Sequence, residues 1–337
     1  RFTQGNQEIV ISTELDELTD HTNLVAKLKK VNINDFTQLI LKQPRLEGIL
    51  TGTLKLRDPF GKRIIEYDAA AEDFKLDNSE IGTVKIKGEV NTTTGEITAK
   101  GNADGKKYKF DIDGKYNYKD SSSNQSNFTF KAERFDISIL DNYLKGIFSN
   151  MTGNLNSDLR VYGGPGNRYV TGLLNITEGS LKVDYTQCTY KFINETINFN
   201  PDEIDFGILQ LKDTLNNTGT ASGKLHHRFF TDFSFENIRF ETGKMLLLNT
   251  SSHDNSQFYG TVTGKALMTL NGPITDMRMN ITGEPSKVDS SHIYIPTGSS
   301  QEYGKIDYID FIQYGDKMED EFKGREASNF FVNMNLT

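Results

Sequence analysis

Apolar residues recur at every second position along much of this chain. The clearest case lies between residues 246 and 283, where two consecutive stretches each keep one parity. The apolar positions there are Val262, Ala266, Met268 and Leu270, then Met277, Met279 and Ile281. A period of two is typical of a β-strand that has one apolar face and one polar face. This region therefore predicts two strands whose apolar sides face the same way.

The same alternation predicts strands over most of the remaining sequence. The positions between the apolar ones are mostly Lys, Asp, Asn, Thr or Ser, which is typical of antiparallel sheets with one solvated face. Turn sequences such as Asp58-Pro59-Phe60-Gly61, Thr94-Gly95 and Asp104-Gly105 separate these strands and join neighbours into a meander. We expect an all-β fold with few short helices.

Helical patterns are limited to two short segments, Asp35 to Lys42 and Asp141 to Phe148, and Asn34 is a possible cap of the first. Each is followed by a strand headed by a Thr-Gly pair, so the two segments form a weak internal repeat. In a third copy, Leu246 to Leu248 take the place of the helix. The three pairs are Thr51-Gly52, Thr152-Gly153 and Thr263-Gly264. Repetition of this kind favours an elongated body built from similar units.

A one-sided sheet must cover its apolar face with a second sheet, a helix layer or a ligand. The predicted helices are too few to form a layer. A closed sandwich stays open as an alternative from the pattern alone. An outer-membrane barrel is also compatible with alternating strands, but the many short Gly-headed strands and the lack of aromatic girdles disfavour it. The apolar positions that we expect to line a groove are Phe110, Phe128, Phe130, Leu155, Leu159, Leu174, Ile176, Val183, Phe233, Phe235, Met268, Leu270, Met277 and Met279.

Composition excludes several classes of function. The formal net charge of -8 is unsuited to a nucleic-acid interface, which needs clustered Lys and Arg.

No run approaches the roughly 18 apolar residues of a membrane-spanning helix. The single cysteine, Cys188, excludes an internal disulfide, and we expect it to be a small buried or half-buried side chain. Because the chain starts at Arg1 and ends on a strand-like pattern at Phe331 to Leu336, we expect it to be part of a larger protein.

No catalytic or metal-binding pattern emerges from the polar residues. Adjacent strand residues face opposite sides, so His226 and His227 are poorly placed to bind one metal ion. Asp111 and Asp113 share a face with Lys109 and fit an ordinary solvated strand. The sequence contains no local signature of a nucleophilic triad or a phosphate-binding loop. We therefore expect neither an enzyme nor a cofactor or metal site.

The region from Gly164 to Tyr314 resembles the carboxyl-terminal part of TamB-type translocation and assembly module proteins, in the form found in Bacteroidota-like bacteria. The order and spacing of several short stretches carry this resemblance, whereas the first 150 residues share only the general alternation. The stretches are Gly172 to Tyr185, Thr189 to Phe192, Ile197 to Asp202, Leu248 to Thr250, Asp254-Asn255, Phe258 to Gly260, Asn271 to Pro273, Ile293 to Pro296 and Tyr308 to Phe311.

The resemblance implies a segment of a periplasmic protein that is anchored in the inner membrane through a part absent from this chain. Its implied partners are phospholipid acyl chains and an Omp85-type outer-membrane barrel similar to TamA. The implied fold is an elongated antiparallel sheet curled into a hydrophobic trough. The implied function is phospholipid transport between the two membranes along this hydrophobic groove. An alternative is outer-membrane protein assembly or protein secretion, in which nascent outer-membrane proteins add strands to the open sheet edges. A surface adhesin is a third possibility, supported only by Tyr116 and Tyr118.

These implications divide the chain into three regions. Residues 1–160 are expected to form repeating units of the β-trough, and residues 161–315 form the TamB-like region. Residues 316–337 are expected to form a charged loop followed by a truncated strand.

Overall fold

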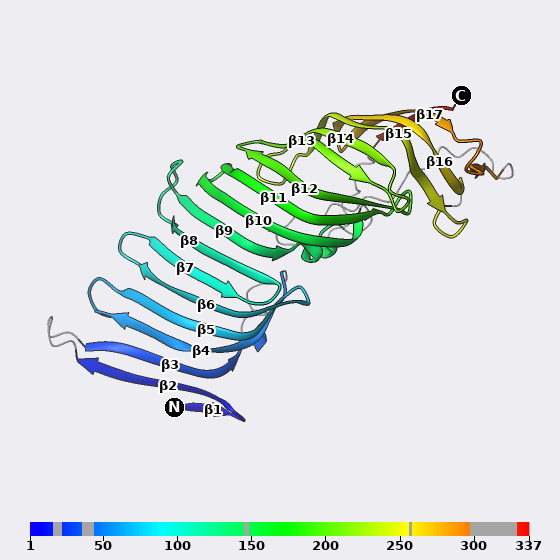
Figure 1. Cartoon of the computed structure of the whole chain (residues 1–337). Coiled ribbons are helices and arrows are strands. Elements are labelled where there is room, and N and C mark those ends of the chain that lie inside the picture. Colours follow the sequence, from blue (N-terminus) through cyan, green and yellow to red (C-terminus); the bar gives the residue numbers. More distant parts are fainter. Residues whose placement is uncertain (16–21, 36–43, 145–147, 256–257, 297–328, 337) are drawn as a thin grey trace. The chain divides into compact units, whose positions relative to one another are not determined.

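The computed structural model describes residues 1–15, 22–35, 44–144, 148–255, 258–296 and 329–336. The chain is all-β, and its 19 strands form one long, open antiparallel sheet in which β17 and β19 pair in parallel (Figure 1). Strands that follow one another in sequence are neighbours in the sheet through most of its length. The predicted all-β antiparallel fold class is therefore confirmed.

The first half of the sheet contains nine strands. They are β1 (Phe2–Gln4), β2 (Gln7–Leu15), β3 (Thr22–Asn32), β4 (Leu46–Arg57), β5 (Ile64–Leu76), β6 (Ser79–Asn91), β7 (Glu96–Asp104), β8 (Tyr108–Asn117) and β9 (Ser126–Asp136). Tight turns join them because residues that tolerate a positive φ stand where a hairpin needs one. Asp77 and Asn78, for example, have φ values of 47° and 72° between β5 and β6.

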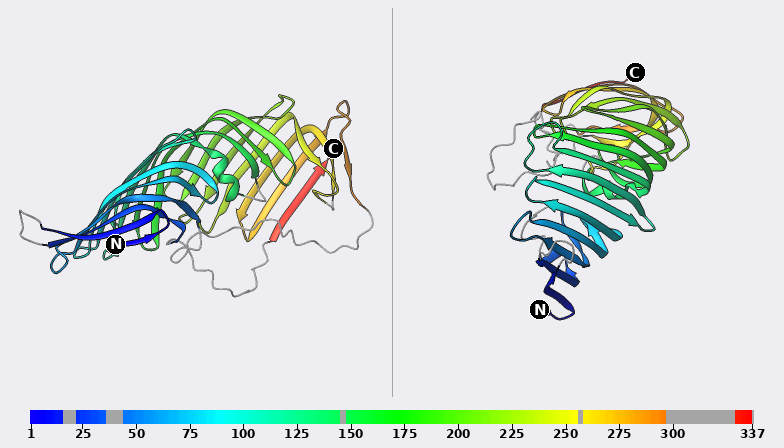
Figure 2. Two further views of the ribbon diagram at one scale, coloured as in Figure 1. Left: turned by 90° about the horizontal axis from the view of Figure 1, so that it is seen from below. Right: turned by 90° about the vertical axis from the view of Figure 1, so that its left-hand side faces the viewer.

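The second half contains ten strands. They are β10 (Phe148–Gly164), β11 (Asn167–Val183), β12 (Cys188–Asn200), β13 (Glu203–Lys212), β14 (Thr218–His226), β15 (Ser234–Thr250), β16 (Tyr259–Pro273), β17 (Asp276–Pro285), β18 (His292–Tyr294) and β19 (Asn329–Leu336). Strands β12 to β16 bend along their length (Figure 2). β19 confirms the strand predicted at Phe331 to Leu336, while residues 316–328 lie outside the described ranges.

The chain forms two compact units. Unit 1 comprises Arg1–Phe135 and Asn156–Gly172, and unit 2 comprises Asp136–Leu155 and Leu173–Thr337. β10 and β11 contribute to both units. The expected boundary at residue 160 falls inside β10, and the division into residues 1–160, 161–315 and 316–337 stays a prediction.

The helical predictions are only partly met. Of the helix predicted over Asp141 to Phe148, residues 145–147 lie outside the described ranges and Phe148 begins β10. A 3-10 helix, η1, spans Ile137–Asn142. It begins early because the Asp136 side chain caps it by accepting a hydrogen bond from the Ser138 backbone N–H, whereas the Asp141 carboxylate accepts one from Met151 N–H in β10.

The other two copies of the repeat also differ from expectation. Asn34 and Asp35 are helical, but residues 36–43 lie outside the described ranges. The third copy has no helix, because Leu246 to Leu248 lie within β15. Each Thr-Gly pair also lies inside its strand rather than at its head, because the strands start earlier than the apolar alternation does. Gly52 lies in β4, Gly153 in β10 and Gly264 in β16.

Candidate functional site

One face of unit 1 is apolar across seven strands, β3 to β9. Residues that face each other across neighbouring strands lie on the same side of a sheet, so the pairing register defines cross-strand rows. Four such rows consist almost entirely of apolar residues and are called here the unit 1 apolar face. They are Leu24, Leu56, Ile65, Val90, Ile97 and Tyr116; Ala26, Leu54, Tyr67, Gly88, Ala99, Gly114 and Phe128; Leu28, Gly52, Ala69, Ile86, Gly101, Ile112 and Phe130; and Val31, Leu50, Ala71, Val84, Ala103, Phe110 and Ala132.

The opposite face of the same strands is polar. A representative row contains Lys27, Thr53, Asp68, Lys87, Lys100, Asp113 and Thr129. Ion pairs cross it, including Lys100 with Asp113 at 3.0 Å and Arg57 with Glu66 at 3.0 Å. Unit 1 thus separates apolar from charged side chains by face, as the alternation in the sequence predicts.

The rows of the unit 1 apolar face differ in their exposure. Val31 and Ala103 are 3% and 2% exposed, while Leu54 and Ile86 in the neighbouring rows are 40% and 42% exposed. The row that contains Val31 and Ala103 is therefore mostly covered, and the exposed part of the face lies on the other three rows. At strand spacings of about 4.8 Å and same-face residue spacings of about 6.8 Å, these rows span roughly 14 Å by 30 Å. An apolar patch of about 400 Å² is within the range of the largest patches on monomers, which are often functional.

Glycines allow aromatic rings to lie flat on this face. A Cβ at Gly114 would lie 2.4 Å from Cδ1 of Phe128, and one at Gly88 would lie 2.5 Å from the hydroxyl oxygen of Tyr67. The Tyr67 hydroxyl donates a hydrogen bond of 2.7 Å to the Thr98 carbonyl. The rings therefore cover the backbone of the adjacent strand, and the half-buried phenol has its polar atom satisfied.

β-bulges keep the apolar residues on one side where their spacing in sequence changes. Leu28 is followed by Val31, and Ala71 by Phe74, so the spacing is three instead of two. The register shifts at both places, and Lys30 and Asp73 adopt positive φ values of 51° and 49°. An extra residue in one strand shifts its parity. This change of spacing is a sequence signal for bulges that the alternation alone did not identify.

Three predicted groove residues of unit 1, Phe110, Phe128 and Phe130, lie on its apolar face. Phe110 and Phe130 have ring centroids 5.6 Å apart, and both contact Phe135, at 6.0 and 5.9 Å. Phe128 lies on the same face over Gly114. Leu159, on the part of β10 that belongs to unit 1, is half-buried.

Unit 2 has a corresponding apolar face on β13 to β17. Met268 pairs with Phe240 and Ile281, and Leu270 pairs with Met279. The unit 2 apolar face consists of two cross-strand rows. They are Leu209, Ala221, Phe240, Met268 and Ile281, and Ile238, Leu270 and Met279.

The other predicted positions of unit 2 occupy varied surroundings. Leu155 and Ile176 are buried, as is Met277, which has the same parity as Met279, while Leu174 and Phe235 are half-buried. Phe233 lies just before β15, and its ring packs edge-on against His227 with centroids 6.3 Å apart. Val183 packs against a buried cluster around Tyr190.

This cluster closes one end of the unit 2 strands. It consists of buried Cys188, Tyr190 and Met245, with Val183, Leu211, Phe240, Leu246 and Leu247 packed against it, and is called here the Tyr190 cluster. Tyr190 lies on β12, yet its hydroxyl donates to the Leu246 carbonyl of β15 at 3.0 Å and its ring lies 6.0 Å from that of Phe240. β13 and β14 separate β12 from β15, so the sheet folds over itself at this end.

A buried carboxylate fixes the same closure. Asp213, which is 1% exposed, accepts hydrogen bonds from the backbone N–H groups of Leu215, Asn217 and Leu246 and from the Asn217 side chain. Burial acts to raise the pKa of Asp213, but these hydrogen bonds outweigh it and hold the pKa below its ordinary value. Asp213 thus binds the β13–β14 turn to β15 as a carboxylate.

The sequence reading missed the roles of Tyr190, Met245 and Asp213. It correctly expected Cys188 to be buried or half-buried, and burial raises the pKa of this thiol to about 11. Asp-Thr-Leu-Asn-Asn at 213–217 is a recognisable turn sequence, but its contact with residue 246 has no local signal.

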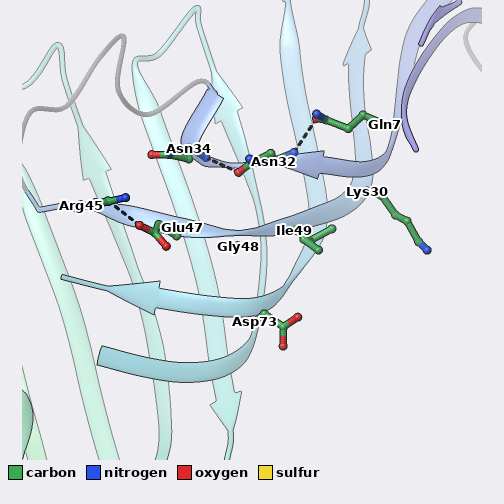
Figure 3. A pocket seen from close by; sticks show the side chains of 9 residues that line it. All are labelled: Gln7, Lys30, Asn32, Asn34, Arg45, Glu47, Gly48, Ile49 and Asp73. Atoms are coloured by element: carbon green, nitrogen blue, oxygen red, sulfur yellow. Dashed lines mark hydrogen bonds and ion pairs between the residues drawn. The ribbon is translucent and has the colours of Figure 1, made fainter. Parts of the chain in front are cut away.

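A separate pocket of about 350 Å³ lies beside the bulges of β3 to β5 (Figure 3). Its lining is polar and mixed in charge. Lys30 and Asp73 both contribute, Arg45 pairs with Glu47 at 2.6 Å, and the Gln7 side chain accepts a hydrogen bond from Asn32 N–H at 2.9 Å. The pocket is therefore unsuited to an apolar ligand.

The two adjacent histidines occupy different surroundings. His226 pairs with Glu236, while His227 is buried and stacks on Phe230 with ring centroids 5.1 Å apart. Burial lowers the pKa of His227. No cluster of three or more metal-ligating side chains occurs in the described ranges, and no helix there is long and apolar enough to cross a membrane.

Comparison with known proteins found no match: no family model, no curated protein and no solved structure is similar to this chain.

Proposed function

We propose that this chain binds phospholipid acyl chains on its apolar faces and forms part of a groove for phospholipid transport between two membranes. The observation that carries this proposal is the unit 1 apolar face, whose four rows run without a charged residue from β3 to β9. Ile86 and Leu54 in the middle of this face are about two-fifths exposed. A surface of this kind needs an apolar ligand or partner.

Acyl chains suit such a surface because their burial makes no directional demand on the residues beneath them. Each fully buried CH₂ group contributes about 0.8 kcal/mol. A chain of about 16 carbons that lies with one side against the sheet therefore gains on the order of 5 kcal/mol. That gain is sufficient to hold a lipid tail and small enough to let it move along the strands.

The resemblance to TamB-type proteins supports the wider setting of this proposal. In that setting the chain is a periplasmic segment of a protein anchored in the inner membrane, and its partner is an Omp85-type outer-membrane protein. The segments of the resemblance, residues 164–314, include β11 to β18, and these strands carry the unit 2 apolar face.

Two matched pairs of variants test the binding of acyl chains. Ile86→Asp and Leu270→Asp place a carboxylate on the unit 1 and unit 2 apolar faces, while Lys85→Asp and Thr269→Asp place one on the opposite face of the same strands. We expect lipid that co-purifies with the chain, measured by mass spectrometry, to fall only in the two apolar-face variants, Ile86→Asp and Leu270→Asp. Equal lipid content in all four folded variants would refute the proposal.

A second candidate function is assembly of outer-membrane proteins by strand addition. One observation favours it: Phe331 and Val332 on β19 are 57% and 40% exposed, although adjacent residues face opposite sides of a strand. Photocrosslinking from Val332 distinguishes the two functions. Lipid adducts are expected for transport, and adducts with nascent outer-membrane proteins are expected for assembly.

A further inference from the structure

The turn between β4 and β5 presents an aromatic side chain entirely to solvent. Phe60 is 100% exposed, and its neighbours are Pro59, Gly61, Lys62 and Arg63. Among the large apolar side chains of the described residues, Phe60 is the most exposed. Its ring is therefore accessible to another surface.

The turn is rigidly built despite this exposure. The Asp58 carbonyl accepts hydrogen bonds from Gly61 N–H at 3.1 Å and Arg63 N–H at 3.0 Å, and the Asp58 carboxylate accepts one from Lys62 N–H at 2.9 Å. Asp58 and Arg63 also adopt positive φ values of 46° and 50°, a conformation that L-residues adopt at a cost. The turn thus holds Phe60 outward by a specific, strained structure.

Two neighbouring turns on the same rim of unit 1 support this one. The hydroxyls of Thr93 and Thr92 donate to the carbonyls of Lys62 and Arg63 at 2.8 and 2.9 Å. The Lys119 ammonium in turn donates to the carbonyls of Thr92 and Thr93, each at 2.8 Å. The turns after β4, β6 and β8 therefore form one hydrogen-bonded strip along the rim (Figure 1).

The charges around Phe60 are suited to an anionic surface. Within the described part of the chain, the side chains of Lys62 and Arg63 take part in no ion pair. The Asp58 carboxylate is turned into the loop, where it accepts the hydrogen bond from Lys62 N–H and lies against Gly61. An exposed aromatic ring beside basic side chains is the arrangement by which protein surfaces enter the interface of a membrane with anionic lipids.

We propose that the Asp58–Arg63 turn docks unit 1 onto an anionic lipid bilayer. Phe60 inserts at the boundary between headgroups and acyl chains, and Lys62 and Arg63 contact lipid phosphates. Leu56 and Ile65, the end of one row of the unit 1 apolar face, lie on the two strands that carry the turn. A lipid tail that leaves the bilayer at this turn would meet the apolar face there. The use of the turn as an entry for acyl chains rests on the proposed function, while membrane contact by the turn does not.

The absence of tryptophan from the chain allows a direct test on the 337-residue chain. Phe60→Trp introduces a single fluorescent reporter. Vesicles of phosphatidylcholine with phosphatidylglycerol should shift its emission to the blue, and brominated acyl chains should quench it. Vesicles of phosphatidylcholine alone, or added salt, should weaken the effect, because salt screens attraction between surface charges.

A matched control is available in unit 2. Leu215, in the β13–β14 turn, is 60% exposed and has Thr214 and Asn216 beside it instead of basic residues. Leu215→Trp should show no shift with the same vesicles. Equal shifts in the two variants would mean general adsorption and would overturn the assignment to the Asp58–Arg63 turn. The assignment would also be overturned if the emission of Phe60→Trp changed only on addition of a partner protein and not with vesicles. Phe60 would then fit a protein pocket.

Vesicle co-sedimentation measures the strength of the contact. Phe60→Ser should lower partitioning about tenfold, and removal of Lys62 or Arg63 by alanine should lower it about fivefold each. Binding of acyl lipid in the absence of vesicles should be unchanged in Phe60→Ser. Unchanged partitioning of these variants into vesicles would refute membrane docking. The apolar face is tested separately by bound lipid, which should fall in Ile86→Asp and stay unchanged in Phe60→Ser.

Discussion

Replacement of Asp213 by Asn should weaken unit 2 strongly although it changes only one atom. The carboxylate accepts four hydrogen bonds, of which Leu246 N–H at 2.7 Å and the Asn217 side-chain amide at 2.9 Å reach Oδ2. An amide in place of the carboxylate keeps one acceptor oxygen and points an NH₂ group at donors. Hydrogen bonds to a charged group contribute about 1.5–3 kcal/mol each, so we expect a loss of about 3 kcal/mol.

The pH dependence of stability gives a second, independent measurement. The pKa of Asp213 lies below its ordinary value because its hydrogen bonds outweigh the effect of burial. A carboxyl group with a depressed pKa contributes stability that is present above its unfolded-state pKa, about 3.9, and is lost as the pH falls through the folded-state pKa. The difference between the wild type and Asp213→Asn should therefore be full at neutral pH and shrink below about pH 4.

Urea unfolding of the chain, followed by circular dichroism, measures both effects. Asp232→Asn is the control, because Asp232 lies in the same unit and its ion pair with Arg228 is largely exposed, with 68% of the Asp232 side chain accessible. Exposed ion pairs contribute about 0–1 kcal/mol. If Asp213→Asn unfolds within about 0.5 kcal/mol of the control, or differs equally at pH 3 and pH 7, Asp213 does not act as a buried carboxylate.

Two further predictions concern glycine packing and the cysteine. Gly114→Ala should destabilise unit 1 by about 2 kcal/mol in the same urea assay, because its Cβ would lie 2.5 Å from the Asn127 carbonyl oxygen. Gly101→Ala, whose nearest atom would be 3.4 Å away, should cost much less; equal costs would contradict this packing. Cys188 should resist thiol reagents at pH 8 in the folded chain and react after unfolding, because its pKa is raised to about 11 and it is 1% exposed. Rapid labelling of the native chain would show that the Tyr190 cluster opens.

The alternation of apolar and polar residues was sufficient to predict the fold class and much of each apolar face. In an antiparallel sheet, side-chain direction follows from position within the strand. Residues such as Phe110 and Phe130, or Leu270 and Met279, therefore share a face once their strands are neighbours. The bulges beside Lys30 and Asp73 were also encoded locally, as a change of apolar spacing from two to three.

The helix at Ile137–Asn142 shows where local reasoning fails. Leu144, Ile147 and Phe148 formed the apolar pattern of the predicted helix, but Phe148 begins β10. The choice was decided by Asp136, which caps an earlier turn, and by Asp141, which binds the backbone of β10. Single hydrogen bonds to side chains set these boundaries, and the apolar period does not record them.

By itself the sequence determined an all-β chain with one apolar side, since strand periodicity is a local property of neighbouring residues. Only the tertiary structure decided where that side is filled and where it stays exposed. Tyr190 reaches Leu246 across two intervening strands, and Asp213 binds the same strand from a distant turn, so the Tyr190 cluster closes one end of unit 2. Ile86, with the same alternation around it, stays 42% exposed. The exposure of these apolar residues differs because curvature and long-range contacts depend on the whole sheet. The face on which a side chain lies, in contrast, depends only on its position within the strand.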